Sequence, residues 1–137
     1  MSLYRFFASD KEMPEFDSMH VTPGKANNSI SVIDENHALR IKKENDLYYA
    51  SQYTDKEFVN YIEWHYNDEN AEIIINYIKD LLKDRFSVFL YNTWNDDKSP
   101  VNVTKININD LSVQDIRKLW GQESFSNNEC LQIYKEY

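Results

Sequence analysis

Hydrophobic and polar side chains alternate over several short stretches of the chain and recur at helical spacing in two others, which predicts an α+β protein. Aromatic and apolar residues over 3–8 predict a first strand. Residues 9–28 are mainly polar and predict a long loop, either mobile or functional. Short apolar runs over 30–33, 38–42 and 47–53 predict three more strands, so we expect an N-terminal β meander.

The stretch over 58–66 admits two interpretations. Thr54 followed by Glu57 has the form of a helix capping box, which favours a helix. Val, Ile, Tyr and Trp dominate the stretch, however, and these residues favour strands. We therefore expect a strand with two distinct faces. One face would carry Phe58, Asn60, Ile62, Trp64 and Tyr66, and the other Val59, Tyr61, Glu63 and His65.

The remaining pattern predicts two helices and three strands. The first helix is expected to begin at Asn67 or Asp68, because either side chain can cap a helix, and its apolar residues then recur every three or four positions. The second helix is expected to begin at Ser112 and to end at Gly121. The expected strands cover 86–91, 101–108 and 130–134, and the middle one should contain an irregularity where its apolar positions change phase.

From about residue 58 to residue 135 the expected order is strand, helix, strand, strand, helix, strand. This is the order of a ferredoxin-like βαββαβ unit. Right-handed crossovers would place both helices on one face of a mostly antiparallel sheet. The other face would be open or covered by the N-terminal strands. We therefore expect a single α+β domain over 1–137.

The charge is strongly negative and concentrated in the middle of the chain. Fifteen Lys and Arg against 23 Asp and Glu give a net charge of −8. Residues 46–100 hold five basic and eleven acidic side chains, or −6 of this total. Such a field repels phosphate backbones, so nucleic acid is not an expected partner, although a protein with a basic surface is.

Nothing in the sequence indicates secretion or membrane insertion. The first residues lack the apolar core of a signal peptide, and no apolar run is long enough to span a membrane. The one cysteine, Cys130, has no partner for an intramolecular disulfide and lies in an apolar stretch, as expected for a small buried side chain. We expect a cytoplasmic protein without membrane contact.

No stretch of the sequence carries a known catalytic motif such as Gly-x-Ser-x-Gly, Cys-x-x-Cys or His-Glu-x-x-His. Glu63 and His65 stand two residues apart, which places both on one face of a strand, within reach of one metal or one proton. Two ligands do not form a metal site, and His20 and His37 lie far away in the sequence. The sequence thus predicts no catalytic residue, no metal and no cofactor.

Two function hypotheses follow. The first is a non-enzymatic protein-binding or regulatory module that uses an acidic surface containing aromatic residues. The alternative is a small-molecule-binding domain or enzyme with a pocket on the open sheet face near Glu63 and His65. The candidate binding residues are Tyr61, Glu63, His65 and Trp94. Both a monomer and a homodimer are consistent with the sequence, since an unpaired edge strand would favour pairing.

Three stretches carry a resemblance to other proteins: residues 3–15, residues 53–57 leading into 62–64, and residues 91–94. Together they resemble a family of small acidic uncharacterised proteins from low-GC Gram-positive bacteria. This agrees with the abundance of Asn, Lys, Ile and Tyr, which AT-rich codons encode. The resemblance implies no activity, so no residue takes a role from it.

Overall fold

A single twisted sheet organises the chain in the computed structural model, which describes residues 3–18, 38–94, 99–121 and 128–136. Within these residues the sheet has seven strands in the order β2-β3-β4-β1-β5-β7-β6. Neighbouring strands run antiparallel except for β6 and β7, which are parallel. The strands are β1 (Leu3–Ser9), β2 (Phe16–Asp17), β3 (Leu39–Lys43), β4 (Phe58–Trp64), β5 (Ser87–Trp94), β6 (Asn102–Asn107) and β7 (Glu129–Tyr134).

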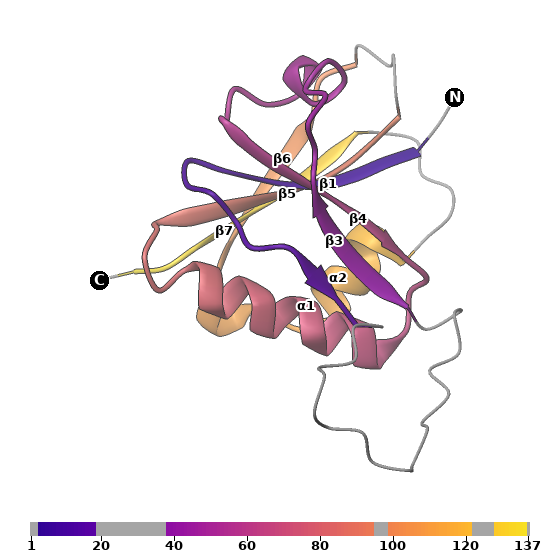
Figure 1. Ribbon diagram of the computed structural model, residues 1–137. Helices are drawn as coiled ribbons and strands as arrows, with labels where there is room; N and C mark the ends of the chain where they lie inside the picture. Colours follow the sequence, from indigo (N-terminus) through magenta and orange to yellow (C-terminus); the bar gives the residue numbers. More distant parts are fainter. Residues whose placement is uncertain (1–2, 19–37, 95–98, 122–127, 137) are drawn as a thin grey trace.

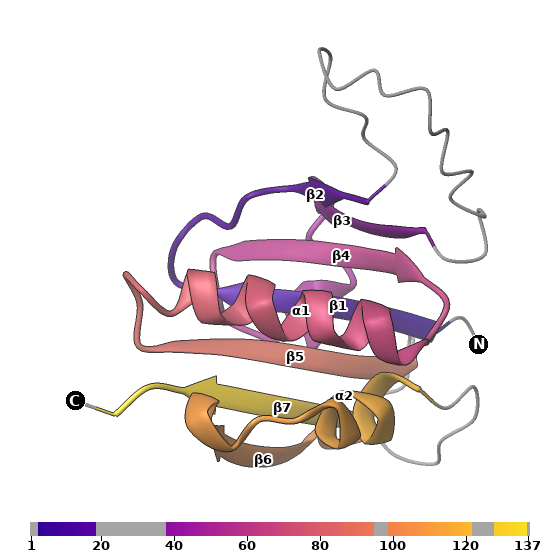
Figure 2. The same cartoon turned by 90° about the horizontal axis from the view of Figure 1, so that it is seen from below.

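Two α-helices, α1 (Asp68–Leu81) and α2 (Val113–Trp120), cover the same face of the sheet (Figures 1 and 2). The side chain of Asn67 caps α1 by accepting a hydrogen bond from the backbone N–H of Asn70 at 2.8 Å. Ser112 and Asp115 form a capping box at the start of α2. The larger hydrophobic core lies between these helices and the sheet. Its fully buried side chains include Phe7, Met13, Leu39, Ile41, Ile74, Ile78, Leu90, Ile116, Trp120 and Ile133.

A second, smaller cluster lies on the opposite face of the sheet, which we call the helix-free face. Because strand residues alternate between faces, Phe6 and Ala8 point to this side while Phe7 points to the helices. The rings of Phe6 and Tyr91 stack with centroids 4.7 Å apart. The connection between β3 and β4 arches over this face (Figure 1) and contributes Ala50, which is fully buried.

The expected strand over 58–66 is confirmed, as β4. Thr54 does not cap a helix. Its hydroxyl instead accepts a hydrogen bond from the backbone N–H of Lys56 at 3.2 Å, in a turn that leads into the strand. The faces of β4 follow the expected alternation, with Ile62 in the core under the helices and Val59 in the cluster on the helix-free face.

The order of elements from β4 to β7 matches a βαββαβ unit, but the strand order of a ferredoxin-like fold is not confirmed. In that fold each half of the unit contributes a strand between the two strands of the other half. Here β1, from outside the unit, lies between β4 and β5, and β6 and β7 are direct parallel neighbours. The sheet is therefore larger than expected, and its centre is the N-terminal strand.

Three local expectations differ from the structure. Residues 47–53 do not form a strand: they contain turns and the short 3-10 helix η2 (Ala50–Gln52). The strand β6 pairs with β7 in an unbroken register, so the phase change reflects apolar side chains on both faces rather than an irregularity. The loop predicted from residue 9 is interrupted by β2 and by the buried Met13. The strand expected over 30–33, the loop residues 19–28, His20 and His37 lie outside the described residues.

Among the described residues, no helix is both long and apolar enough to cross a bilayer.

Candidate binding surface

The connection between β3 and β4, residues 44–57, forms a folded cover on the helix-free face. Its first residue donates a backbone hydrogen bond from Glu44 N–H to the carbonyl of Val59, at 2.9 Å. Near its other end, the hydroxyl of Tyr53 donates to the carbonyl of Trp94, at 2.5 Å. The buried Ala50 anchors the middle. The segment is thus tied to β4 and β5, and its outer side chains have a defined position. We call these exposed side chains the 44–57 surface.

Glu44 is fixed by a hydrogen bond from the sheet beneath it. The hydroxyl of Tyr4 donates to Glu44 Oε2 at 3.0 Å, and the N–H of Asp46 donates to Glu44 Oε1 at 3.1 Å. Burial, together with the neighbouring carboxylate of Glu44, raises the pKa of Tyr4 well above its ordinary value. Tyr4 therefore stays protonated and remains a donor, which holds the carboxylate in place.

Three consecutive apolar or aromatic side chains project from this segment into solvent. Leu47 is 39% exposed, Tyr48 64% and Tyr49 39%. The rings of Tyr48 and Tyr49 meet edge to face with centroids 5.0 Å apart. Asp46 accepts a hydrogen bond from the N–H of Tyr48 at 3.0 Å, which fixes the start of this run. Contiguous exposure of such residues is unusual on a protein surface and is typical of a binding site.

Four carboxylates belong to the same segment as this apolar run. The segment carries Glu44, Asp46, Asp55 and Glu57 against one basic residue, Lys56. The amine of Lys56 lies 5.0 Å above the ring of Phe89 and 3.4 Å from the carboxylate of Asp10, so its charge is largely engaged within the protein. The 44–57 surface therefore combines an excess of negative charge with exposed aromatic residues.

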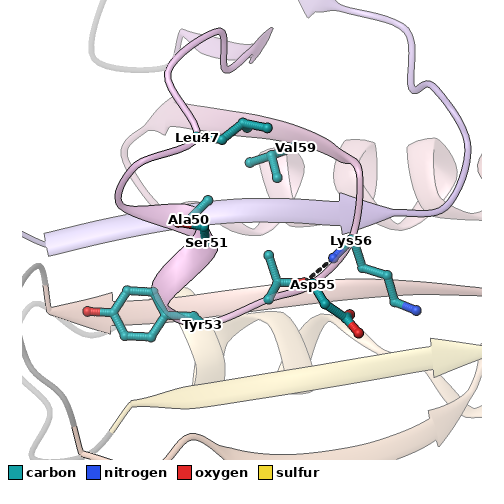
Figure 3. Close-up of a pocket in the computed structure, with 8 residues that line it drawn as sticks. Leu47, Ala50, Ser51, Tyr53, Asp55, Lys56 and Val59 are labelled. Carbon is teal, nitrogen blue, oxygen red and sulfur yellow. Dashed lines mark hydrogen bonds between the residues drawn. The ribbon is translucent and has the colours of Figure 1, made fainter.

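A cavity of about 430 Å³ opens within the same segment (Figure 3). In Figure 3, Leu47 and Val59 lie near one end of the cavity and Asp55 and Lys56 near the other. The complete lining is Leu47, Ala50, Ser51, Tyr53, Thr54, Asp55, Lys56 and Val59. Aliphatic side chains and hydroxyl groups thus line the same cavity, a composition suited to an organic group with a polar end.

The structure does not bring the four predicted binding residues together. Tyr61 is half-buried in the aromatic cluster of the helix-free face, and Glu63 and His65 are exposed at the far end of β4. Trp94 lies on β5, which is separated from β4 by β1. Because Tyr91 points to the helix-free face, alternation places the side chain of Trp94 on the face that the helices cover. None of the four lines the cavity described above.

The residues of the 44–57 surface were missed because their sequence resembles a strand. Leu47, Tyr48 and Tyr49 are apolar or aromatic, and such runs predict buried positions. The preceding Asn45-Asp46 pair, which favours turns, is the signal that could have found an exposed loop here.

Neither metal nor thiol chemistry finds support in the described part of the chain. No three His, Cys, Asp or Glu side chains among the described residues gather closely enough to hold a metal ion. Cys130 is buried beside Tyr91, and burial raises the pKa of its thiol to about 12. The thiol is therefore protonated at neutral pH and is a poor nucleophile.

Comparison of the chain with protein-family models, curated proteins and solved structures found no match.

Proposed function

We propose that this protein is a non-enzymatic binding module that uses the 44–57 surface to hold a basic segment of another protein. The observation that carries the proposal is the exposed run Leu47–Tyr49 on a segment rich in carboxylates and anchored at both ends. Tyrosines often act as anchors at protein interfaces, because they bury a large area and lose little side-chain entropy.

The carboxylates of the segment select the sign of the partner's charge. Glu44, Asp46, Asp55 and Glu57 favour lysine and arginine and repel phosphate groups. A basic peptide with an aliphatic or aromatic side chain would place that side chain against Tyr48 and Tyr49, with its charges toward the carboxylates of the segment. Because exposed charge pairs are screened by salt, such binding should weaken as ionic strength rises.

Selection from a library of random displayed peptides tests this proposal. We expect the selected peptides to be rich in Lys and Arg and to contain at least one large apolar residue. The double substitution Tyr48→Ala and Tyr49→Ala should weaken binding of a selected synthetic peptide at least tenfold, by fluorescence anisotropy, through loss of the aromatic contact area.

The substitution Phe86→Ala is the matched control. Phe86 is 69% exposed but lies between α1 and β5, away from the 44–57 surface, so its loss should leave peptide affinity unchanged. Selected peptides without a basic excess, or peptides that bind the double variant as tightly as the unaltered protein, would contradict the proposal.

The cavity favours a second candidate function, the binding of a small organic molecule. Its volume of about 430 Å³ lies within the range of ligand pockets, about 300–1,000 Å³. The cavity lies on the helix-free face, the side to which Glu63 also points by alternation with Val59. Its lining comes from the 44–57 segment and Val59, however, and does not include Glu63.

A fragment screen followed by protein NMR separates this candidate from the first. Fragments that bind should shift the signals of Val59 and Thr54, and Ser51→Trp should abolish those shifts by filling the cavity. Gln52→Trp is the control, because Gln52 is the next residue along but does not line the cavity. Equal loss in both variants would count against binding in the cavity.

A further inference from the structure

The strand β6 forms one edge of the sheet, and among the described strands only β7 pairs with it. Its N–H at Asn102 donates to the carbonyl of Asn128 at 2.9 Å, so Asn102 faces β7, as do Thr104 and Ile106 by alternation. The backbone groups of Val103 and Lys105 therefore point away from the sheet. No described strand pairs with them on that side.

The side chains of this edge are also suited to pairing. Val103 is 57% exposed and lies on the helix-free face, beside the buried Cys130 of β7. It extends the apolar cluster of that face to the rim of the molecule. The strand contains no proline or glycine, and Lys105 is its only charged residue, so it has few of the features that normally protect an edge strand.

We propose that β6 pairs with β6 of a second copy of this chain. The two strands would run antiparallel around a two-fold axis perpendicular to the sheet, with Val103 opposite Val103 of the other copy. Residues that face each other across such an axis lie on the same side of the sheet, so this register joins the two exposed valines. It also places Lys105 opposite Val101. In this register the backbone N–H and C=O of Val103 in one copy form hydrogen bonds with the C=O and N–H of Val103 in the other.

Self-complementarity favours a second copy over a foreign strand, because the exposed Val103 of one copy meets the exposed Val103 of the other. Two molecules of net charge −8 repel each other over most of their surfaces, but β6 itself carries a single positive charge. Pairing there brings only one charged side chain of each β6 strand to the interface, and it makes the apolar strip of the helix-free face continuous across the axis. A single pair of edge strands buries a small area, so we expect a weak dimer with a dissociation constant in the micromolar range or above.

Sedimentation velocity over a concentration series tests the dimer. The unaltered protein should shift from monomer to dimer as its concentration rises. Val103→Asp should weaken this association at least tenfold, because it places two carboxylates opposite each other on the axis. Thr104→Asp adds the same charge at the next residue, on the other face and off the axis, so it should change association less than threefold.

Cysteine cross-linking tests the register. Because Val103 and Cys130 are neighbours on β6 and β7, the background must carry Cys130→Ala to prevent an internal disulfide. In that background Val103→Cys should form a disulfide-linked dimer on oxidation, and Thr104→Cys should not. A protein that stays monomeric at every concentration, a dimer indifferent to Val103→Asp, or preferential cross-linking at residue 104 would each overturn the proposal.

Discussion

Replacement of Trp120 by alanine is expected to lower the free energy of unfolding by about 3–5 kcal/mol, the usual cost of truncating a fully buried aromatic side chain. Trp120 has no exposed surface and lies where α2 meets the sheet. Its ring meets Phe7 edge to face at 5.2 Å and Trp64 at 6.0 Å. No smaller side chain can keep these contacts, so the substitution leaves a cavity between α2 and the sheet.

Trp120 also makes a hydrogen bond that a second substitution isolates. Its indole Nε1 donates to the carbonyl of Tyr91 on β5, at 3.0 Å. Trp120→Phe retains much of the ring volume but removes this donor, so we expect a loss of about 1–3 kcal/mol. Urea denaturation followed by far-UV circular dichroism measures both values. If the alanine variant loses no more stability than the phenylalanine variant, the packing role assigned to Trp120 is wrong.

The elements of the fold could be predicted where local pattern alone determines them. The alternation across β4 outweighed a capping signal at Thr54 and Glu57, because the side chains of β4 contact a buried core on both faces. The caps of α1 and α2 were predictable for a similar reason, since a cap depends on residues three or four positions apart.

The strand order could not be predicted from such local patterns. Which strand lies between β4 and β5 depends on the pairing of β1, residues 3–9, with residues 49 or more positions away. Phe6 and Phe7 make this central position favourable because each fills a different core cluster, one on each face of the sheet. The sequence shows both residues as apolar, but it does not show that both faces of the sheet have a core.

The exposure of the candidate site also depends on contacts between residues that are distant in the sequence. Tyr48 and Tyr49 have the composition of a strand, and the anchoring of Glu44 by Tyr4 and of Tyr53 by the carbonyl of Trp94 helps to hold the segment outside the sheet. Both contacts join residues about 40 positions apart. No spacing in the sequence indicates them.

In the proposed dimer, the two 44–57 surfaces could bind one partner at the same time. A two-fold axis perpendicular to the sheet would leave both helix-free faces on the same side of the dimer, and with them both 44–57 surfaces. A partner with two basic segments could then bind both surfaces, and the second contact would form at a high effective concentration. The Val103→Asp variant should therefore lose affinity for a tandem peptide but keep its affinity for a single one.

A second large effect on stability is expected at Arg85, in the turn after α1. Its side chain is 7% exposed and joins two parts of the chain. Nη1 donates to the carbonyl of Leu81 at 3.0 Å, near the end of α1, and Nη2 donates to the carbonyl of Glu12 at 2.8 Å. Arg85→Met keeps the aliphatic volume but leaves both carbonyls without their donor. We expect a loss of about 2–4 kcal/mol in the free energy of unfolding.

The matched control for Arg85→Met is the replacement of another basic residue, Lys83, by methionine. The side chain of Lys83, just after the end of α1, is 77% exposed and pairs with Asp80 at 2.8 Å, so Lys83→Met should cost less than about 0.5 kcal/mol. Arg85→Lys should fall between the two, because one ammonium group cannot reach both carbonyls with the geometry of the guanidinium fork. Guanidinium denaturation gives all three values. Equal stability of the two methionine variants would show that the bonds from Arg85 to Leu81 and Glu12 do not stabilise the fold.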